Sequence, residues 1–146
     1  MHRALITGGT AGIGAAFARA FAGRGTALVL VARNPERLEE TAAQFRREYG
    51  VEVETIVADL SDREAQQRVA DRLESSVDPV DVFVNNAGFS VKASLLDPDL
   101  SQHDLGFEVM VRAVLKLGGA AGRGMSERGR GWIINVGSVS ALVTQN

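Results

Sequence analysis

Three glycines near the amino terminus carry the clearest chemical signal in the sequence. The stretch LITGGTAGIGAAFARAF, residues 5–21, places Gly8, Gly12 and Gly14 where an apolar run gives way to an alanine-rich, helix-like run. A glycine-rich turn between a strand and a helix lets backbone N–H groups approach a diphosphate, and the positive end of the helix then faces the anion. Tight turns also favour glycine without any ligand. The strand pattern before the turn and the helix pattern after it favour the phosphate-binding interpretation.

A second candidate is Arg33, which follows the apolar run TALVLVA at 26–32. Nucleotide-binding sheets that prefer NAD place an acidic residue at the end of the second strand, where it binds the ribose 2′-hydroxyl. Here that position is Ala32, and the guanidinium that follows can bind a 2′-phosphate instead. A hydrogen bond to a charged partner contributes about 1.5–3 kcal/mol, which is enough to favour NADP(H) over NAD(H). The alternative is a solvent-exposed arginine at the start of a helix, where a positive charge is not favoured.

Alternating strands and helices position these residues. Apolar runs predict strands at 4–7, 26–32, 51–57, 80–86 and 131–138. Between them, helical patterns cover 12–23, 34–50, a segment that begins with a Ser61–Glu64 capping box, and about 102–122. In the second of these, Asn34 is predicted to cap the helix, Pro35 to take its first position and Gly50 to end it. This order predicts an α/β fold, a doubly wound parallel sheet with helices on both faces. Such sheets bind ligands beyond the carboxyl ends of their strands, which is where the three glycines lie.

Composition narrows the remaining possibilities. The 146 residues suffice for one domain, and we expect residues 1–146 to form a single unit. A net charge of −2 disfavours nucleic acid as a partner. The sequence contains no run of about 18 apolar residues, so no membrane span is predicted. No signal-peptide pattern precedes the first strand, and we therefore expect a cytoplasmic protein. Cysteine is absent and His2 and His103 are isolated, so no metal site is expected.

The order of the motifs resembles the short-chain dehydrogenase/reductase family. The resemblance covers nearly the whole chain and rests on T-G-x-x-x-G-I-G at 7–14, ADL at 58–60, NNAG at 85–88 and IINVGS at 133–138. It implies a Rossmann-type NAD(P)-binding domain, truncated after the fifth strand, and hydride transfer between a nicotinamide and a carbonyl or alcohol substrate. The residues that it places at the cofactor are Thr7, Gly8, Gly12, Ile13, Gly14, Asp59, Leu60, Asn86, Ala87 and Gly88, with Asn85 bracing the central strand. It makes Ser138 the catalytic residue that binds the substrate oxygen.

The sequence departs from the family pattern at the catalytic centre. The family uses a Tyr-x-x-x-Lys pair after the serine, but the single tyrosine here, Tyr49, has no lysine four residues later. Met110 stands where an asparagine of the proton relay is expected. Three hypotheses follow. The first is an NADP(H)-dependent oxidoreductase that is inactive as this chain alone, and the second is a non-catalytic NADP-binding fragment or pseudoenzyme. The third and weaker one is a purely structural remnant that binds no nucleotide.

The last third of the sequence gives three structural expectations. Glycines at 118, 119, 122 and 124 each cost about 1 kcal/mol of helix propensity, which predicts a frayed end for the long helix. The fifth strand is expected to form an apolar sheet edge that promotes self-association, and a complete chain is expected to form a homo-oligomer. Trp132, at the start of that strand, is expected to be a packing residue.

Overall fold

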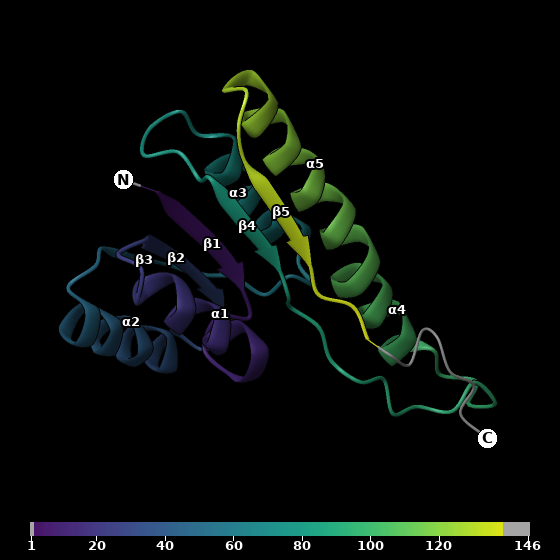
Figure 1. Cartoon of the computed structure of the whole chain (residues 1–146). Coiled ribbons are helices and arrows are strands. Elements are labelled where there is room, and N and C mark those ends of the chain that lie inside the picture. The colour runs from purple at the N-terminus through teal and green to yellow at the C-terminus, as the bar shows by residue number, and fades with distance from the viewer. Residues whose placement is uncertain (1, 139–146) are drawn as a thin grey trace.

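Strands and helices alternate along the chain, as the sequence predicts (Figure 1). The computed structural model describes residues 2–138. The strands are β1 (Arg3–Thr7), β2 (Ala27–Ala32), β3 (Val53–Val57), β4 (Val82–Asn85) and β5 (Trp132–Asn135). The helices are α1 (Gly12–Ala22), α2 (Pro35–Tyr49), α3 (Arg63–Glu74), α4 (Ser101–Phe107) and α5 (Ala113–Glu127), with the π-helical turn η1 (Glu108–Arg112) joining the last two.

The strands form one parallel sheet in the order β3-β2-β1-β4-β5. Strand β1 lies between β2 and β4, with Leu5 opposite both Val29 and Phe83. The chain moves outward from β1 to β3 and then returns to β4 on the other side of β1. The order of strands therefore reverses at the carboxyl ends of β1 and β4, which is where such sheets bind ligands. The predicted doubly wound parallel sheet is confirmed.

Helices cover both faces of the sheet (Figure 1). Helices α1 and α2 cover one face, and α3 and α5 cover the other, so that each face has its own core of buried side chains. All residues of β2 from Ala27 to Val31 are buried, which explains why this strand shows no polar alternation. Most residues that helical spacing predicts to point inward are buried: Leu38, Ala42 and Phe45 on α2, and Ala65, Val69 and Leu73 on α3. Tyr49, predicted on the same face of α2, is only partly buried.

The local sequence was sufficient to predict the amino-terminal cap of α2 but not that of α3. In α2, Asn34 Oδ1 accepts a hydrogen bond from Arg37 N at 2.8 Å, so the predicted cap is confirmed. The predicted capping box at Ser61 is wrong. Asp62 caps α3 instead, because its carboxylate accepts from the N–H groups of the first turn while Ser61 is hydrogen-bonded to Asp59.

The long helix does not fray at its glycines. Helix α5 continues through all four of them to Glu127. A Cβ on Gly124 would lie 2.9 Å from Leu73 O, so the missing side chain lets α5 pack directly on the end of α3. The buried residues Leu117 and Met125 lie on the same contact face. Tertiary packing therefore offsets the low helix propensity of the glycines.

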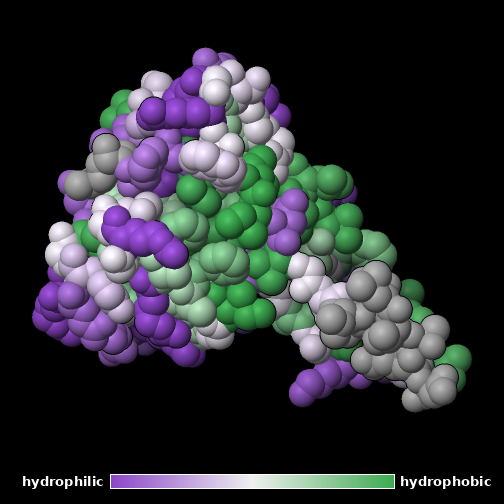
Figure 2. All heavy atoms as spheres, in the orientation of Figure 1, coloured by the Kyte–Doolittle hydropathy of each residue, from purple (hydrophilic) through white to green (hydrophobic). Residues whose placement is uncertain are grey.

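Strand β5 lies at the edge of the sheet and is only partly covered. Trp132 is 60% exposed and Ile133 is 39% exposed, so the expected packing role of Trp132 is wrong. Figure 2 shows hydrophobic residues gathered on the face of the molecule that carries this edge. The remainder of the apolar run, residues 139–146, lies outside the described residues. Within 2–138, no helix is long and apolar enough to span a bilayer.

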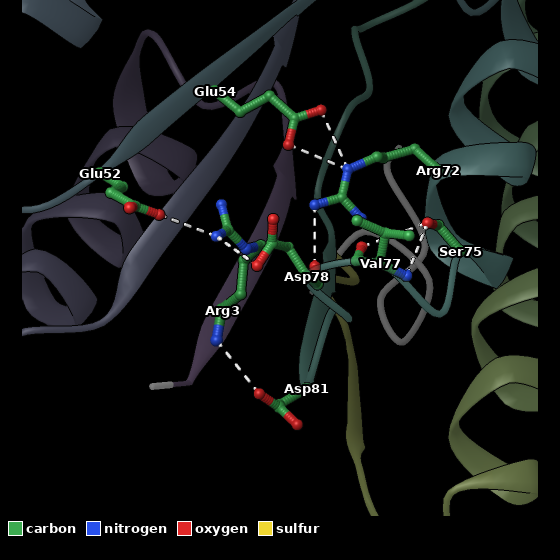
Figure 3. Close-up of polar contacts among 8 residues, drawn as sticks. All are labelled: Arg3, Glu52, Glu54, Arg72, Ser75, Val77, Asp78 and Asp81. Carbon is green, nitrogen blue, oxygen red and sulfur yellow. Dashed lines mark hydrogen bonds and ion pairs between the residues drawn. The ribbon is translucent and has the colours of Figure 1, made fainter.

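Ion pairs link the opposite, amino-terminal edge of the sheet (Figure 3). Arg3, at the start of β1, pairs with Glu52 at 2.9 Å, and its backbone N–H donates to the buried carboxylate of Asp81. Arg72 of α3 binds Glu54 of β3 through Nε at 2.9 Å. These charges lie at the amino ends of the strands, whereas the ligand site of such a sheet lies at the carboxyl ends of β1 and β4. They therefore stabilise the fold and are not part of the candidate site.

Candidate functional site

A cavity of about 510 Å³ opens at the carboxyl ends of the strands. Five segments line it: the glycine turn after β1, the segment from the end of β2 into the first turn of α2, the loop after β3, the NNAG segment with Phe89 after β4, and the α4–η1 helix. The predicted site residues among its lining are Gly8, Gly12, Ile13, Arg33, Asp59, Leu60, Asn86, Ala87 and Gly88. Thr7, Gly14 and Ser138 are not part of the lining.

The glycine turn brings the backbone close to itself and leaves it open to the cavity. A Cβ on Gly14 would lie 2.2 Å from Gly8 O, so α1 can start directly against the turn only without a side chain there. Gly12 has φ +51°, and a Cβ on it would meet nothing within 4 Å. Helix α1 has no side-chain cap and no acidic residue in its first turn, so nothing from the helix itself competes for an anion at its amino end.

Thr7 joins the ends of β1 and β4 beneath this turn. Its buried Oγ1 accepts hydrogen bonds from the backbone N–H groups of Asn86 and Ala87, both at 3.0 Å. Asn86 Nδ2 donates in return to Thr7 O at 2.9 Å. The neighbouring Asn85 donates through Nδ2 to Val114 O of α5 at 3.3 Å. Thr7 and Asn85 therefore position the NNAG segment, and the three residues of that segment after Asn85 line the cavity.

Two arginines border the cavity beyond β2. Arg33 and Arg37 are exposed and both belong to the lining. The pKa of Asp59 is lowered, mainly by the hydrogen bond from the backbone N–H of Ser61 at 2.9 Å, and the nearby charge of Arg33 acts in the same direction. Sequence reasoning missed Arg37, although its place in the first turn of the helix that follows Arg33 is a signal that it lies near the end of β2.

An apolar wall from the α4–η1 helix was also missed. Leu105 and Val109 line the cavity, together with Phe89 from the loop after β4. Their register could not be read from the sequence, because η1 shifts the helix by one residue within a single turn.

The residues tied to catalysis are placed as follows. Met110 lies beside the NNAG segment, since a Cβ on Gly88 would be 3.6 Å from Met110 Sδ. Ser138 is exposed and follows β5 at the same edge of the sheet as the cavity. Tyr49 lies at the end of α2, where its ring packs against Phe45 with 5.8 Å between ring centroids. Among residues 2–138 no cluster of acidic side chains and histidines could hold a metal ion.

Comparison with known proteins connects this site to a family. Residues 2–146 match the family model described as short chain dehydrogenase. Gluconate 5-dehydrogenase of Gluconobacter oxydans is 36% identical over 139 residues, covering 95% of this chain and 54% of that protein. The very-long-chain 3-oxoacyl-CoA reductase of Anas platyrhynchos is 34% identical over 145 residues, covering 95% of this chain and 46% of that protein.

Solved structures give the same result. The short-chain dehydrogenase of Sphingobium yanoikuyae in complex with NADPH superposes with a TM-score of 0.93 and 34% identity, covering 98% of this chain and 56% of that one. The chain spans about half the length of the curated relatives it matches. The glycine turn, the parallel sheet and the sequence match agree, and the chain belongs to the short-chain dehydrogenase family of oxidoreductases.

Proposed function

We propose that this chain forms the cofactor-binding part of an NADP(H)-dependent oxidoreductase that interconverts a carbonyl group and an alcohol on a small molecule. The observation that carries the proposal is a single cavity lined both by the open glycine turn and by two arginines. A volume of about 510 Å³ is in the range of cofactor and ligand sites. The bound cofactor would accept or supply the hydride.

The chain's own groups fit a dinucleotide from one end to the other. The first-turn N–H groups of α1 and the turn at Gly12 would hold the diphosphate. Asp59 and Leu60 would flank the adenine, and Ile13 would cover the diphosphate from the exposed start of α1. The segment Asn86–Gly88 would border the ribose next to the nicotinamide, since Thr7 fixes it beside the glycine turn.

The preference for NADP(H) over NAD(H) rests on charge. Ala32 supplies no carboxylate at the end of β2, so nothing at that position repels a 2′-phosphate. Arg33 and Arg37 supply two guanidinium groups, which bind phosphate oxygens in a bidentate manner. The NADPH in the Sphingobium structure supports a nicotinamide cofactor for a protein of this fold.

A second candidate function is nucleotide binding without turnover. Within the chain, Ser138 is the residue that would bind the substrate oxygen. Met110 has no amide to relay a proton, and Tyr49 packs on Phe45 and not against the cavity. General acid–base catalysis contributes roughly 10²–10⁴-fold to the rate. A chain that binds NADPH but has no acid–base side chain at the substrate oxygen would therefore turn over very slowly. NADPH oxidation measured with a panel of ketones and aldehydes separates the two functions.

Calorimetric titration with NADPH and NADH tests the cofactor. We expect Arg33→Ala and Arg37→Ala to weaken NADPH binding by about 10- to 150-fold when combined, the equivalent of 1.5–3 kcal/mol for a charged hydrogen bond. NADH binding should change little. Arg47→Ala is the matched control, because Arg47 is exposed near the other end of α2 and does not line the cavity. Equal losses for NADPH and NADH would contradict the proposed role of the arginines.

A further inference from the structure

Gln66 of α3 is fully buried and lies between two walls of the cavity. Its Nε2 donates hydrogen bonds to Leu60 O at 2.8 Å and to Glu108 O at 3.3 Å. Because both acceptors are carbonyl oxygens, the amide can have only this orientation. Its Oε1 is buried and has no hydrogen-bond partner within residues 2–138. The donor side of this amide is therefore fully used and the acceptor side is not.

One of the two acceptors defines the π-helical turn. Ala113 N donates to Glu108 O five residues earlier, and Gln66 donates to the same oxygen. A carbonyl oxygen has two lone pairs and can accept both bonds. π-helical turns are rare and are often found at functional sites. Gln66 thus stabilises the turn that joins α4 to α5.

The other acceptor belongs to the loop after β3. Leu60 lines the cavity from this loop, and Val109, the residue after Glu108, lines it from η1. One amide therefore links the backbones of two apolar walls that come from different elements. Arg63 adds an outer link to the Glu108 carboxylate at 2.9 Å, but its side chain is largely exposed and such pairs contribute little.

We propose that Gln66 is a positioning residue that sets the spacing between Leu60 and Val109, the walls between which the adenine ring of the cofactor inserts. This inference rests on the proposed function. An apolar residue of the same size would avoid burying an unpartnered acceptor, which is a destabilising arrangement. The position of the amide is explained if its N–H groups are needed to hold the two walls together.

The test compares NADP with etheno-NADP, whose adenine carries an extra fused ring and needs a wider slot. In the unaltered chain we expect NADP to bind more tightly than etheno-NADP. Gln66→Met, which removes the donors at similar volume, should weaken NADP binding about tenfold, the size of one lost hydrogen bond. It should weaken etheno-NADP binding less, so that the ratio of the two affinities falls. Gln67→Met is the control, because Gln67 is exposed and binds Asp71 on the outer face of the same helix.

The outcomes separate the two proposals. Equal losses for both nucleotides, which leave the ratio of their affinities unchanged, would show that Gln66 has only a structural role and would overturn the inference alone, as would no loss for either. An unaltered, folded chain that binds neither nucleotide would overturn the proposed function as well. If Gln66→Met does not unfold cooperatively, Gln66→Asn decides, since its amide is one methylene too short to reach both carbonyls.

Discussion

Replacing Gly14 by alanine measures how closely α1 must approach the turn that precedes it. The added Cβ would lie 2.2 Å from Gly8 O, 2.6 Å from Asn86 Nδ2 and 2.8 Å from Gly8 C. Two of these atoms belong to the backbone of Gly8, whose N–H is bound to Val31 O at 2.9 Å. No side-chain rotation can relieve the overlap with the backbone, so α1 must move away from the turn.

The magnitude follows from two opposing effects. Overpacking in a close-packed site costs about 1–3 kcal/mol, whereas alanine gains at most about 1 kcal/mol of helix propensity over glycine. With the full propensity gain subtracted, we expect Gly14→Ala to lower the free energy of unfolding by up to about 2 kcal/mol. The displaced helix end should also weaken NADPH binding about tenfold or more, the equivalent of 1.4 kcal/mol.

Gly122→Ala is the matched control for this change. Gly122 is also helical, but a Cβ on it would meet nothing within 4 Å. Only the propensity gain remains, so this variant should be stabilised by up to about 1 kcal/mol and should bind NADPH unchanged. Urea denaturation followed by circular dichroism, with NADPH titration of each variant, measures both quantities. If Gly14→Ala were as stable as Gly122→Ala and bound NADPH normally, the argument from close approach would be refuted.

Three further predictions concern single residues. Thr7→Val should destabilise the chain by about 1–3 kcal/mol in denaturant titrations, because it leaves two N–H groups at the end of β4 unpartnered; Thr7→Ser, which keeps the hydroxyl, should lose less. The lowered pKa of Asp59, due first to the hydrogen bond from Ser61 N, means that its stabilising contribution is complete above the ordinary aspartate value of 3.8 and is lost as pH falls through the lower folded value. The loss of stability at acid pH, measured as the free energy of unfolding against pH, should therefore be smaller in Asp59→Asn. An identical profile would disprove a stabilising role for the Asp59 carboxylate. Asp78 has φ +45°, so Asp78→Gly should raise the melting temperature through relief of about 0.5–1 kcal/mol of backbone strain. The pair that the substitution removes contributes little, because its atoms are 3.8 Å apart and the Asp78 side chain is 72% exposed, although Arg3 is largely buried.

The fold could be predicted from the sequence where short-range signals determined structure. Asn34, Pro35 and Gly50 mark the ends of α2 through local hydrogen bonds and backbone angles, and all three act as predicted. The apolar run of β2 required a strand buried on both faces, and the sheet provides it.

The remaining features depend on contacts made by residues outside the helix that they affect. The cap of α3 moves from Ser61 to Asp62 because Asp59 engages the serine. The π-helical turn is held by Gln66, which is distant from it in sequence, so no helical periodicity could reveal it. In the same way, α5 tolerates Gly124 because that residue packs on α3, a contact that propensity alone does not contain.

The lining of the cavity has a direct consequence for synthesis on the ribosome. Every residue of that lining lies between Gly8 and Val109, and β5 contributes none. A nascent chain that has emerged just past η1 therefore already carries the complete set of groups that we assign to the nucleotide. Domains generally fold as units, and side chains of α5 complete the core on one face of the sheet, so NADPH present during translation would stabilise the domain only once α5 has emerged and packed.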